Sequence, residues 1–353
     1  MRILVSILLS CCVAPAFAQM APADTGMLLP LQDRQGDADL AQFVTEMLET
    51  EFRDSLRLAS SDGLRDELRR LRLRNAGDID TADLRLLAET FDVEWLISAT
   101  LHFATDAPEP QIVVSAWAHR VEENNLAWAG FESGAGLTSE RSLGRDRIEI
   151  IEDLAAVVVR RLVADFEDSL EGDREPIARV QPDRGGFLLK PVAVEQLGTV
   201  AVLPFESVTD VRSAESGELI TALGRALLHR NGATVLHPGR VNAILRRRGV
   251  FMRGELDPLA RAALRMGGDA GHILTGTVEI YEAPAAIEPN PHVAFSARLL
   301  EVDTGRIVWI SGQERKGWDR PGLFGRDRIY DAGSLAENIM QSLVTGLLQP
   351  TKR

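Results

Sequence analysis

The sequence predicts an α/β fold (an α+β mixed sheet) in two tandem, duplicated domains, each a mixed sheet covered by helices. The main evidence is a repeat. Residues 111–130 resemble residues 292–312, and identical residues in the two stretches are 181 positions apart. The matched pairs are Ser115 with Ser296, Ala116 with Ala297, and Trp128 with Trp309. Self-similarity at a fixed offset indicates a repeated structural unit.

A second stretch repeats at the same offset. The letters GRDRI occupy residues 144–148 and again residues 325–329, and a run with helical periodicity follows each. Each domain is therefore expected to end on a helix that comes after a strand hairpin. The turn of the second hairpin contains Gly305, which adopts a positive φ without steric cost.

The elements before the hairpins also correspond. Short apolar strands are predicted at 26–31 and 200–205, each followed by an amphipathic helix and another short strand. Two shorter helices come next, the second of which begins at Asp80 or Asp257, where an aspartate can cap the first free amides. A strongly β-forming strand then opens a three-stranded meander. The predicted order in each domain is β-α-β-α-α-β-β-β-α, with parallel pairing early and antiparallel pairing in the hairpins.

The first residues predict export. Residues 1–18 have a basic start, an apolar core and an Ala-x-Ala cleavage site, as a signal peptide has. We assign residues 19–168 to the first domain, 169–196 to a linker and 197–350 to the second domain. Both cysteines, Cys11 and Cys12, lie in the predicted signal, and lipidation of Cys11 is the less favoured alternative to cleavage. The expected compartment is the periplasm, without a membrane span.

The second half resembles the periplasmic α/β domain shared by CsgG, the amino-terminal part of TolB, and LpoB. The resemblance rests on the stretches GTVAVLPFESVTD, TGTV and LLEVDTGRIVW, and the first half shows a fainter version. It implies a non-catalytic envelope protein that acts through protein contacts. CsgG also forms a membrane barrel and TolB continues into a propeller, and this sequence contains neither the barrel strands nor the blade repeats.

No chemical motif favours catalysis, and we expect no enzyme activity, no cofactor and no metal. The six histidines are scattered singly, no serine lies in a glycine-flanked elbow, and the glycine loops lack a phosphate-binding pattern. The formal net charge of −13 disfavours binding to nucleic acid, which depends on neutralising phosphates.

Basic side chains form the first candidate for partner binding. The helical runs at 64–74 and 241–253 each carry several arginines, which could dock an acidic surface or simply pair with nearby acids on a solvated helix face. The residues chosen from these runs are Arg69, Arg70, Arg246, Arg247 and Arg248.

The repeated GRDRI motif and a loop tryptophan supply the second candidate. Arg326 and Arg328 could bind carboxylates of a partner or form internal salt bridges. Trp318, in a predicted loop, is the best candidate for an exposed aromatic contact.

The leading hypothesis is therefore a periplasmic adaptor or regulator in cell-envelope assembly or secretion. Its expected partner is an envelope protein, either a cell-wall synthase or a secretion component. The alternative is an accessory subunit of an outer-membrane export complex of the curli-secretion type, which would oligomerise and associate peripherally with the outer membrane.

Overall fold

The computed structural model describes most of both predicted domains. The described residues are 24–73, 79–106, 109–136, 147–172, 174, 192–208, 213–247, 249, 257–284, 290–319 and 328–348. The predicted signal peptide and most of the predicted linker lie outside these ranges.

The two domains have the same order of long elements, as the repeat predicted. The first contains β1 (Thr25–Leu28), β2 (Gln32–Asp33), α1 (Ala38–Ser55), β3 (Arg57–Leu58), α2 (Leu64–Arg70), α3 (Thr81–Phe91), β4 (Trp95–Thr105), β5 (Gln111–Arg120), β6 (Trp128–Ala135) and α4 (Ile151–Glu171). The second contains α5 (Val194–Leu197), β7 (Thr199–Val202), β8 (Glu206–Ser207), α6 (Ser213–Arg230), β9 (Thr234–Val235), α7 (Pro238–Arg247), α8 (Pro258–Gly268), β10 (Ala270–Glu282), β11 (His292–Glu301), β12 (Ile307–Lys316) and α9 (Ala332–Leu347).

Each domain forms one mixed sheet, and the two sheets have the same topology. The first sheet has the order β3-β1-β4-β5-β6, and the second has the order β9-β7-β10-β11-β12. Strands β1 and β7 pair in parallel with the long strands β4 and β10 on one side and with the short strands β3 and β9 on the other, whereas the hairpin strands pair antiparallel. The predicted mixed sheet is confirmed, and the added short strands β2 and β8 also pair in parallel with β4 and β10.

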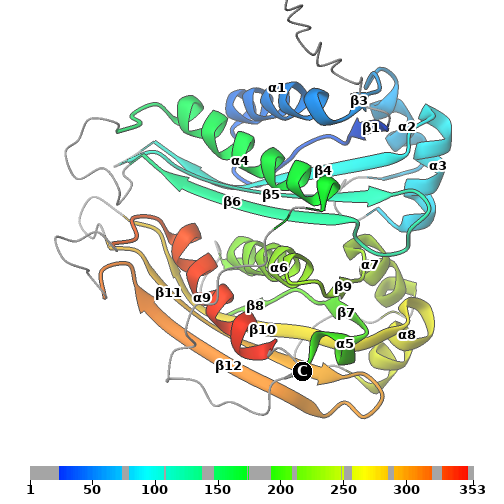
Figure 1. Cartoon of the computed structure of the whole chain (residues 1–353), viewed down its shortest axis with the longest axis vertical. Helices are drawn as coiled ribbons and strands as arrows, with labels where there is room; N and C mark the ends of the chain where they lie inside the picture. Colours follow the sequence, from blue (N-terminus) through cyan, green and yellow to red (C-terminus); the bar gives the residue numbers. More distant parts are fainter. Residues whose placement is uncertain are drawn as a thin grey trace, which may run out of the picture.

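The molecule is layered, with one pair of helices shared by both sheets (Figure 1). Helices α1 and α4 cover one face of the first sheet around a core that contains Phe52, Trp128 and Phe166. Helices α6 and α9 lie between the two sheets, and their core joins side chains of the second sheet to Trp117 and Phe131 of the first. Helices α7 and α8 cover one end of the far face of the second sheet.

Helix ends follow the predicted capping only in part. The side chain of Asp257 accepts a hydrogen bond from the Leu259 amide at 3.0 Å, which confirms the predicted cap of α8. Asp80 precedes α3 but makes no capping hydrogen bond, so that prediction was wrong. Its carboxylate instead accepts from the guanidinium of Arg247, at 2.9 Å, in the other domain.

The two domains are tied together by backbone as well as side chains. The amide of Leu126, after the β5–β6 turn, donates to the carbonyl of Val235 in β9 at 3.0 Å. Asp165 of α4 accepts from Arg174 at 2.5 Å and from the indole of Trp128 at 3.0 Å, and Arg174 in turn lies 3.1 Å from His229 of α6. The side chain of Asp165 is only 12% exposed, and a carboxylate so nearly buried is costly to separate from its partners, so this network helps to fix the domain arrangement.

Small residues allow α9 to approach the first sheet closely. A Cβ atom added at Gly333 would lie 2.7 Å from Cβ of Ser133 and 2.8 Å from Cγ2 of Val113. Such distances are shorter than van der Waals contact, so no larger side chain fits there without movement of the helix. Gly333 is therefore required by the contact between domains.

We predict that Gly333→Val will lower the free energy of unfolding by about 1–3 kcal/mol, because it overpacks this contact. Urea denaturation followed by circular dichroism measures the change. The matched control is Gly224→Ala in α6, where an added Cβ would meet only Leu274 and Met340, each at 3.6 Å. This control should be neutral or stabilising, since alanine favours a helix over glycine. Equal stability of Gly333→Val and the wild type would contradict the described packing.

Candidate functional site

The arginines of α2 pair with acids on their own helix. Arg69 lies 3.2 Å from Asp66, and Arg70 makes a two-pronged contact with Glu67. The side chain of Arg69 is 79% exposed, so its ion pair is strongly screened by water. Hydrogen bonding to Arg70 lowers the pKa of Glu67 from its ordinary value. The geometry is that of a solvated helix face.

The matching arginines of α7 have a different environment. Arg247 forms the interdomain ion pair with Asp80, and Arg246 is exposed beside it. Arg248 lies outside the described residues. The two basic runs therefore have different contacts, although they occupy equivalent places in the two repeats.

The predicted aromatic contact is partly covered. The guanidinium carbon of Arg328 lies 5.1 Å from the ring centroid of Trp318, as in a cation–π pair, and the indole is only half-exposed. The amide of Trp318 donates to Asn290 at 3.1 Å, which anchors the loop. Arg326 lies outside the described residues. The structure thus brings Trp318 and Arg328 together, away from the arginines of α2 and α7.

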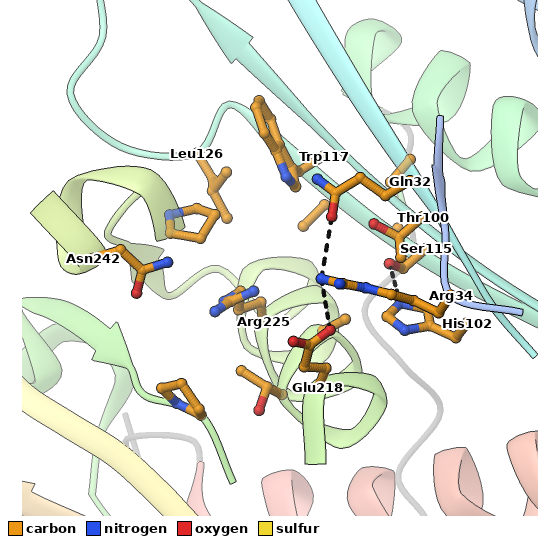
Figure 2. A pocket seen from close by; sticks show the side chains of 17 residues that line it. Gln32, Arg34, Thr100, His102, Ser115, Trp117, Leu126, Glu218, Arg225 and Asn242 are labelled. Carbon is orange, nitrogen blue, oxygen red and sulfur yellow. Dashed lines mark hydrogen bonds and ion pairs between the residues drawn. The ribbon is translucent and has the colours of Figure 1, made fainter. Parts of the chain in front are cut away.

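A pocket lies between the domains, and the sequence did not predict it. We call it the interdomain pocket; its volume is about 130 Å³. Strands β4 and β5 and the segment around β2 form one wall, and helices α6 and α7 form the other (Figure 2). Its polar lining residues are Gln32, Arg34, Thr100, His102, Ser115, Glu218, Thr221, Arg225 and Asn242. Its apolar lining includes Trp117, Leu126, Pro204 and Pro238.

An ion pair crosses the pocket from one domain to the other. Arg34 lies 2.8 Å from Glu218 of α6, and the same guanidinium donates to the carbonyl oxygen of Gln32 at 3.4 Å. Arg225, about two turns further along α6 than Glu218, also lines the pocket (Figure 2). Two arginines and one glutamate therefore belong to the lining of the pocket.

A buried histidine lies beside these charges. His102 is 6% exposed, and its Nε2 lies 2.7 Å from the hydroxyl of Ser115. Burial lowers its pKa to about 3, with further lowering by the charges of Arg34 and Arg225. An imidazole with so low a pKa is neutral and weakly basic at pH 7, which favours a binding role over general-base catalysis.

His102 occupies a β-bulge that both domains share. The register of β4 shifts between Leu101 and Phe103, and that of β10 shifts between Val278 and Ile280. The bulged residue of the second copy is Glu279, whose carboxylate accepts from Ser296 at 3.0 Å. The repeat thus preserves a contact between the bulge and a matched serine, while the bulged residue itself differs. The difference between histidine and glutamate at the two bulges was the feature of the sequence that could have pointed to the interdomain pocket.

A second group of titratable residues lies where β6 meets α9. Glu132 and Glu337 belong to different domains, and burial raises their pKa values to about 8 and about 7. The charge of Glu337 also raises the pKa of Glu132. Asp331 of the same region caps α9 by accepting from Ser334 at 2.6 Å, and burial raises its pKa. Among the described residues, no group of three or more potential ligands could hold a metal ion.

Comparisons with known proteins give likenesses of shape only. No protein-family model matches the chain, and no curated protein matches it. Similar solved structures include the PelC dodecamer from Paraburkholderia phytofirmans, with 18% identity over 46% of this chain and 98% of that chain and a TM-score of 0.30. Lipoprotein GNA1162 from Neisseria meningitidis has 17% identity over 42% of this chain and 98% of its own, with a TM-score of 0.31. The LpoB C-terminal domain from Salmonella enterica has 15% identity over 35% of this chain and 84% of that chain, with a TM-score of 0.26. At these TM-scores the likenesses carry no argument about function.

We predict that stability will fall as pH rises from 6.5 to 8.5, because the folded chain still holds protons on Glu132 and Glu337 that the unfolded chain has already released. Their folded pKa values are raised, so their contribution is fully present below the unfolded value near 4.5 and is lost as pH rises through about 7 and 8. The loss should be about 2 kcal/mol, measured by urea denaturation at several pH values. The buried histidines, with folded pKa values of about 3 and 4, act on the acid side of this window.

The double variant Glu132→Gln with Glu337→Gln should be nearly independent of pH over that window. Glu46→Gln, on the exposed face of α1, is the control and should keep the wild-type profile. A double variant with an unchanged alkaline loss would contradict this assignment.

Proposed function

We propose that the chain is an exported, non-catalytic adaptor or regulator of the cell envelope that acts through protein contacts. Its two domains would be of the type shared by CsgG, the amino-terminal part of TolB, and LpoB. The partner would be a cell-wall synthase or a secretion component. The observation that carries this proposal is the far face of the second sheet, which lacks the helical cover that its counterpart has among the described residues.

Comparison of equivalent residues in the two sheets identifies the uncovered face of the second sheet. Thr100, Ser115 and Phe131 lie side by side across the first sheet, and helices α6 and α9 cover them. The equivalent row in the second sheet is Thr277, Ser296 and Gly312. This second row points away from α6 and α9, because its neighbours Phe295 and Ala297 point into their core. Helices α7 and α8 cover only the end of that face near Ile273.

We call this row and its polar neighbours the outer face; it comprises Thr277, Glu279, Ser296, Arg298, Ile310, Gly312 and Glu314. It extends onto β12, the edge strand of the second sheet (Figure 1). Glu279 is exposed, and the side chain of Glu314 is 65% exposed. A helical surface with small and basic residues would complement it, since Gly333 provides the close approach on the first sheet and the exposed carboxylates here are acidic.

A second copy of the chain is the less suitable occupant of the outer face. Its α1 and α4 would be the equivalents of α6 and α9, but the exposed side of α1 carries Gln42 and Glu46. Acidic Glu46 would face acidic Glu279 and Glu314, and like charges oppose association. The alternative function, an oligomeric accessory subunit of an export complex, depends on contacts between copies and is therefore ranked second. None of the described helices is both long and apolar enough to cross a membrane.

We predict that a photo-crosslinker at Thr277 will capture an envelope protein from periplasm and membranes, whereas one at Gln42 on α1 will not. Mass spectrometry of the crosslinked band identifies the partner. The double charge reversal Arg298→Glu with Glu314→Lys should reduce capture by at least about tenfold, because it inverts the charge pattern of the outer face.

The matched control reverses charges on α1, with Glu46→Lys and Arg53→Glu, and should leave capture unchanged. Sedimentation of the purified protein decides between the two functions. If the protein is a monomer and the outer-face variant still captures the partner as the wild type does, the proposed surface is refuted. A closed oligomer that buries this face would instead favour the alternative function, an accessory subunit of an export complex.

A further inference from the structure

The contact between the two domains shows what one corner of this fold accepts. We call the β5–β6 turn together with the first turn of α3 the first corner. The amide of Leu126 in this turn donates to the carbonyl of Val235 in the edge strand β9 at 3.0 Å. Nη1 of Arg240, in the helix α7 that follows β9, lies 3.4 Å from the hydroxyl of Thr81 and 3.5 Å from Oδ1 of Asn124. The first corner therefore binds an edge strand and an arginine of the next helix.

The second domain has the same corner, but there it is exposed. We call the β11–β12 turn together with the first turn of α8 the second corner. Ile307 precedes Trp309 by two residues, as Leu126 precedes Trp128, so the repeat makes Ile307 and Leu126 equivalent. Leu126 is 4% exposed because the second domain covers it, whereas Ile307 is 37% exposed. Leu259, in the first turn of α8, is 69% exposed.

Exposed apolar side chains gather at the second corner. Seven large apolar side chains are exposed among the described residues, and Leu259, Met266 and Ile307 are three of them. The guanidinium of Arg261 in α8 donates to the carbonyl of Val302 in the β11–β12 turn at 3.0 Å, so α8 lies against that turn. Single exposed apolar side chains are ordinary, but several in one place mark an interaction site. The second corner is therefore a docking surface separate from the polar row of the outer face.

Each corner also carries an acidic side chain for a basic partner. Asp80 precedes α3 and accepts from Arg247 of the second domain at 2.9 Å. Asp257 precedes α8 and is exposed, with one oxygen accepting from the amide of Leu259. The side chain of Asp303, in the β11–β12 turn, is 66% exposed. Because a carboxylate accepts several hydrogen bonds, the second corner can take a basic side chain as the first corner does.

The residues that differ between the two sheets indicate a reversible contact. Arg298 and Gly312 of the outer face occupy the places of Trp117 and Phe131, which α6 and α9 bury in the first domain. Permanent interfaces are more apolar than those between proteins that also exist apart. The second sheet is thus suited to a partner that is not part of the same chain.

We propose that the partner on the outer face is an α/β domain built like the second domain, which extends the proposed function and rests on it. Such a domain would place two helices on the outer face, as α6 and α9 lie on the first sheet. Its short edge strand would lie beside Ile307, and its next helix would bring an arginine to the second corner. Ile307 begins β12, which also carries Ile310 and Glu314 of the outer face, so one partner covers both surfaces.

A second copy of this chain does not supply these contacts. It would offer β3 and α2 in place of β9 and α7. Gly63 lies in the place of Arg240, at an offset of 177 positions. Arg70, the counterpart of Arg247, is already held by Glu67 of its own helix. The occupant of the second corner is therefore a domain of another protein.

Photo-crosslinkers at Ile307 and at Thr277 of the mature chain test this proposal in periplasm and membranes. Both positions should capture the same protein. Mass spectrometry should place the Thr277 crosslink in a helix, and the Ile307 crosslink in a short strand directly before an arginine-bearing helix. Capture at Thr277 but not at Ile307, or peptides from a domain of another kind, would overturn this inference and leave the proposed function standing. Capture at neither position would overturn both.

A substitution at the second corner provides a quantitative readout. Ile307→Asp should reduce capture by the crosslinker at Thr277 by at least about tenfold, because it places a charge in an apolar contact. Leu86→Asp on α3 is the matched control, since Leu86 is 44% exposed and lies outside both surfaces, and capture should stay unchanged. Both substitutions are at exposed positions, so the thermal midpoints should remain near that of the wild type. Undiminished capture by Ile307→Asp would refute the contact at the second corner.

Sedimentation of the purified mature chain tests the identity of the occupant. The chain alone should be a monomer, with or without Ile307→Asp. An oligomer that Ile307→Asp dissociates would show that a second copy covers the second corner, and it would overturn the assignment to another protein.

Discussion

The packing of α6 and α9 between two sheets is the constraint on which the rest of the structure depends. Helix α1 buries one stripe of four side chains, Leu40, Val44, Leu48 and Phe52, because solvent lies beyond it. Helix α9 occupies the equivalent place in the second domain and is buried on nearly every side, including Gly333 and Ser342. If the second domain were removed, Trp117 and Phe131 of the first sheet would be exposed to water. The two repeats therefore fold as one unit, although their sequences suggest two separable domains.

Periodicity predicted the elements well because each helix or strand shows its buried face in its own sequence. The alternation in β5 and β11 and the apolar stripes in α1 and α4 need no knowledge of distant contacts. The interdomain pocket shows no such local pattern. It joins Arg34 to Glu218 and His102 to Arg225, residues that lie far apart in the chain and look like ordinary surface or core positions. Only the packing of one domain on the other brings them together.

Repetition of a charge pattern did not imply repetition of its contacts. Arg70 pairs with Glu67 on its own helix, whereas Arg247, from the corresponding run, pairs with Asp80 in the other domain. The cause is the asymmetry of a two-domain stack. Helix α7 lies beside the first domain, where Arg240 contacts Thr81 and Asn124, whereas the arginines of α2 contact acids on α2 itself. In a tandem repeat, the surface contacts of one copy therefore do not predict those of the other.

The same asymmetry explains why the bulged residue differs between the copies. Glu279 is exposed, where water solvates its carboxylate, and it contacts Ser296. His102 contacts Ser115 at the equivalent place but is enclosed by the second domain. A glutamate at position 102 would carry its charge into an enclosed site, where desolvation disfavours the charged form. The imidazole of His102 avoids this cost, because burial lowers its pKa to about 3 and it is neutral at pH 7. The divergence of the repeat at this bulge thus matches the burial that the second domain imposes on the first copy alone.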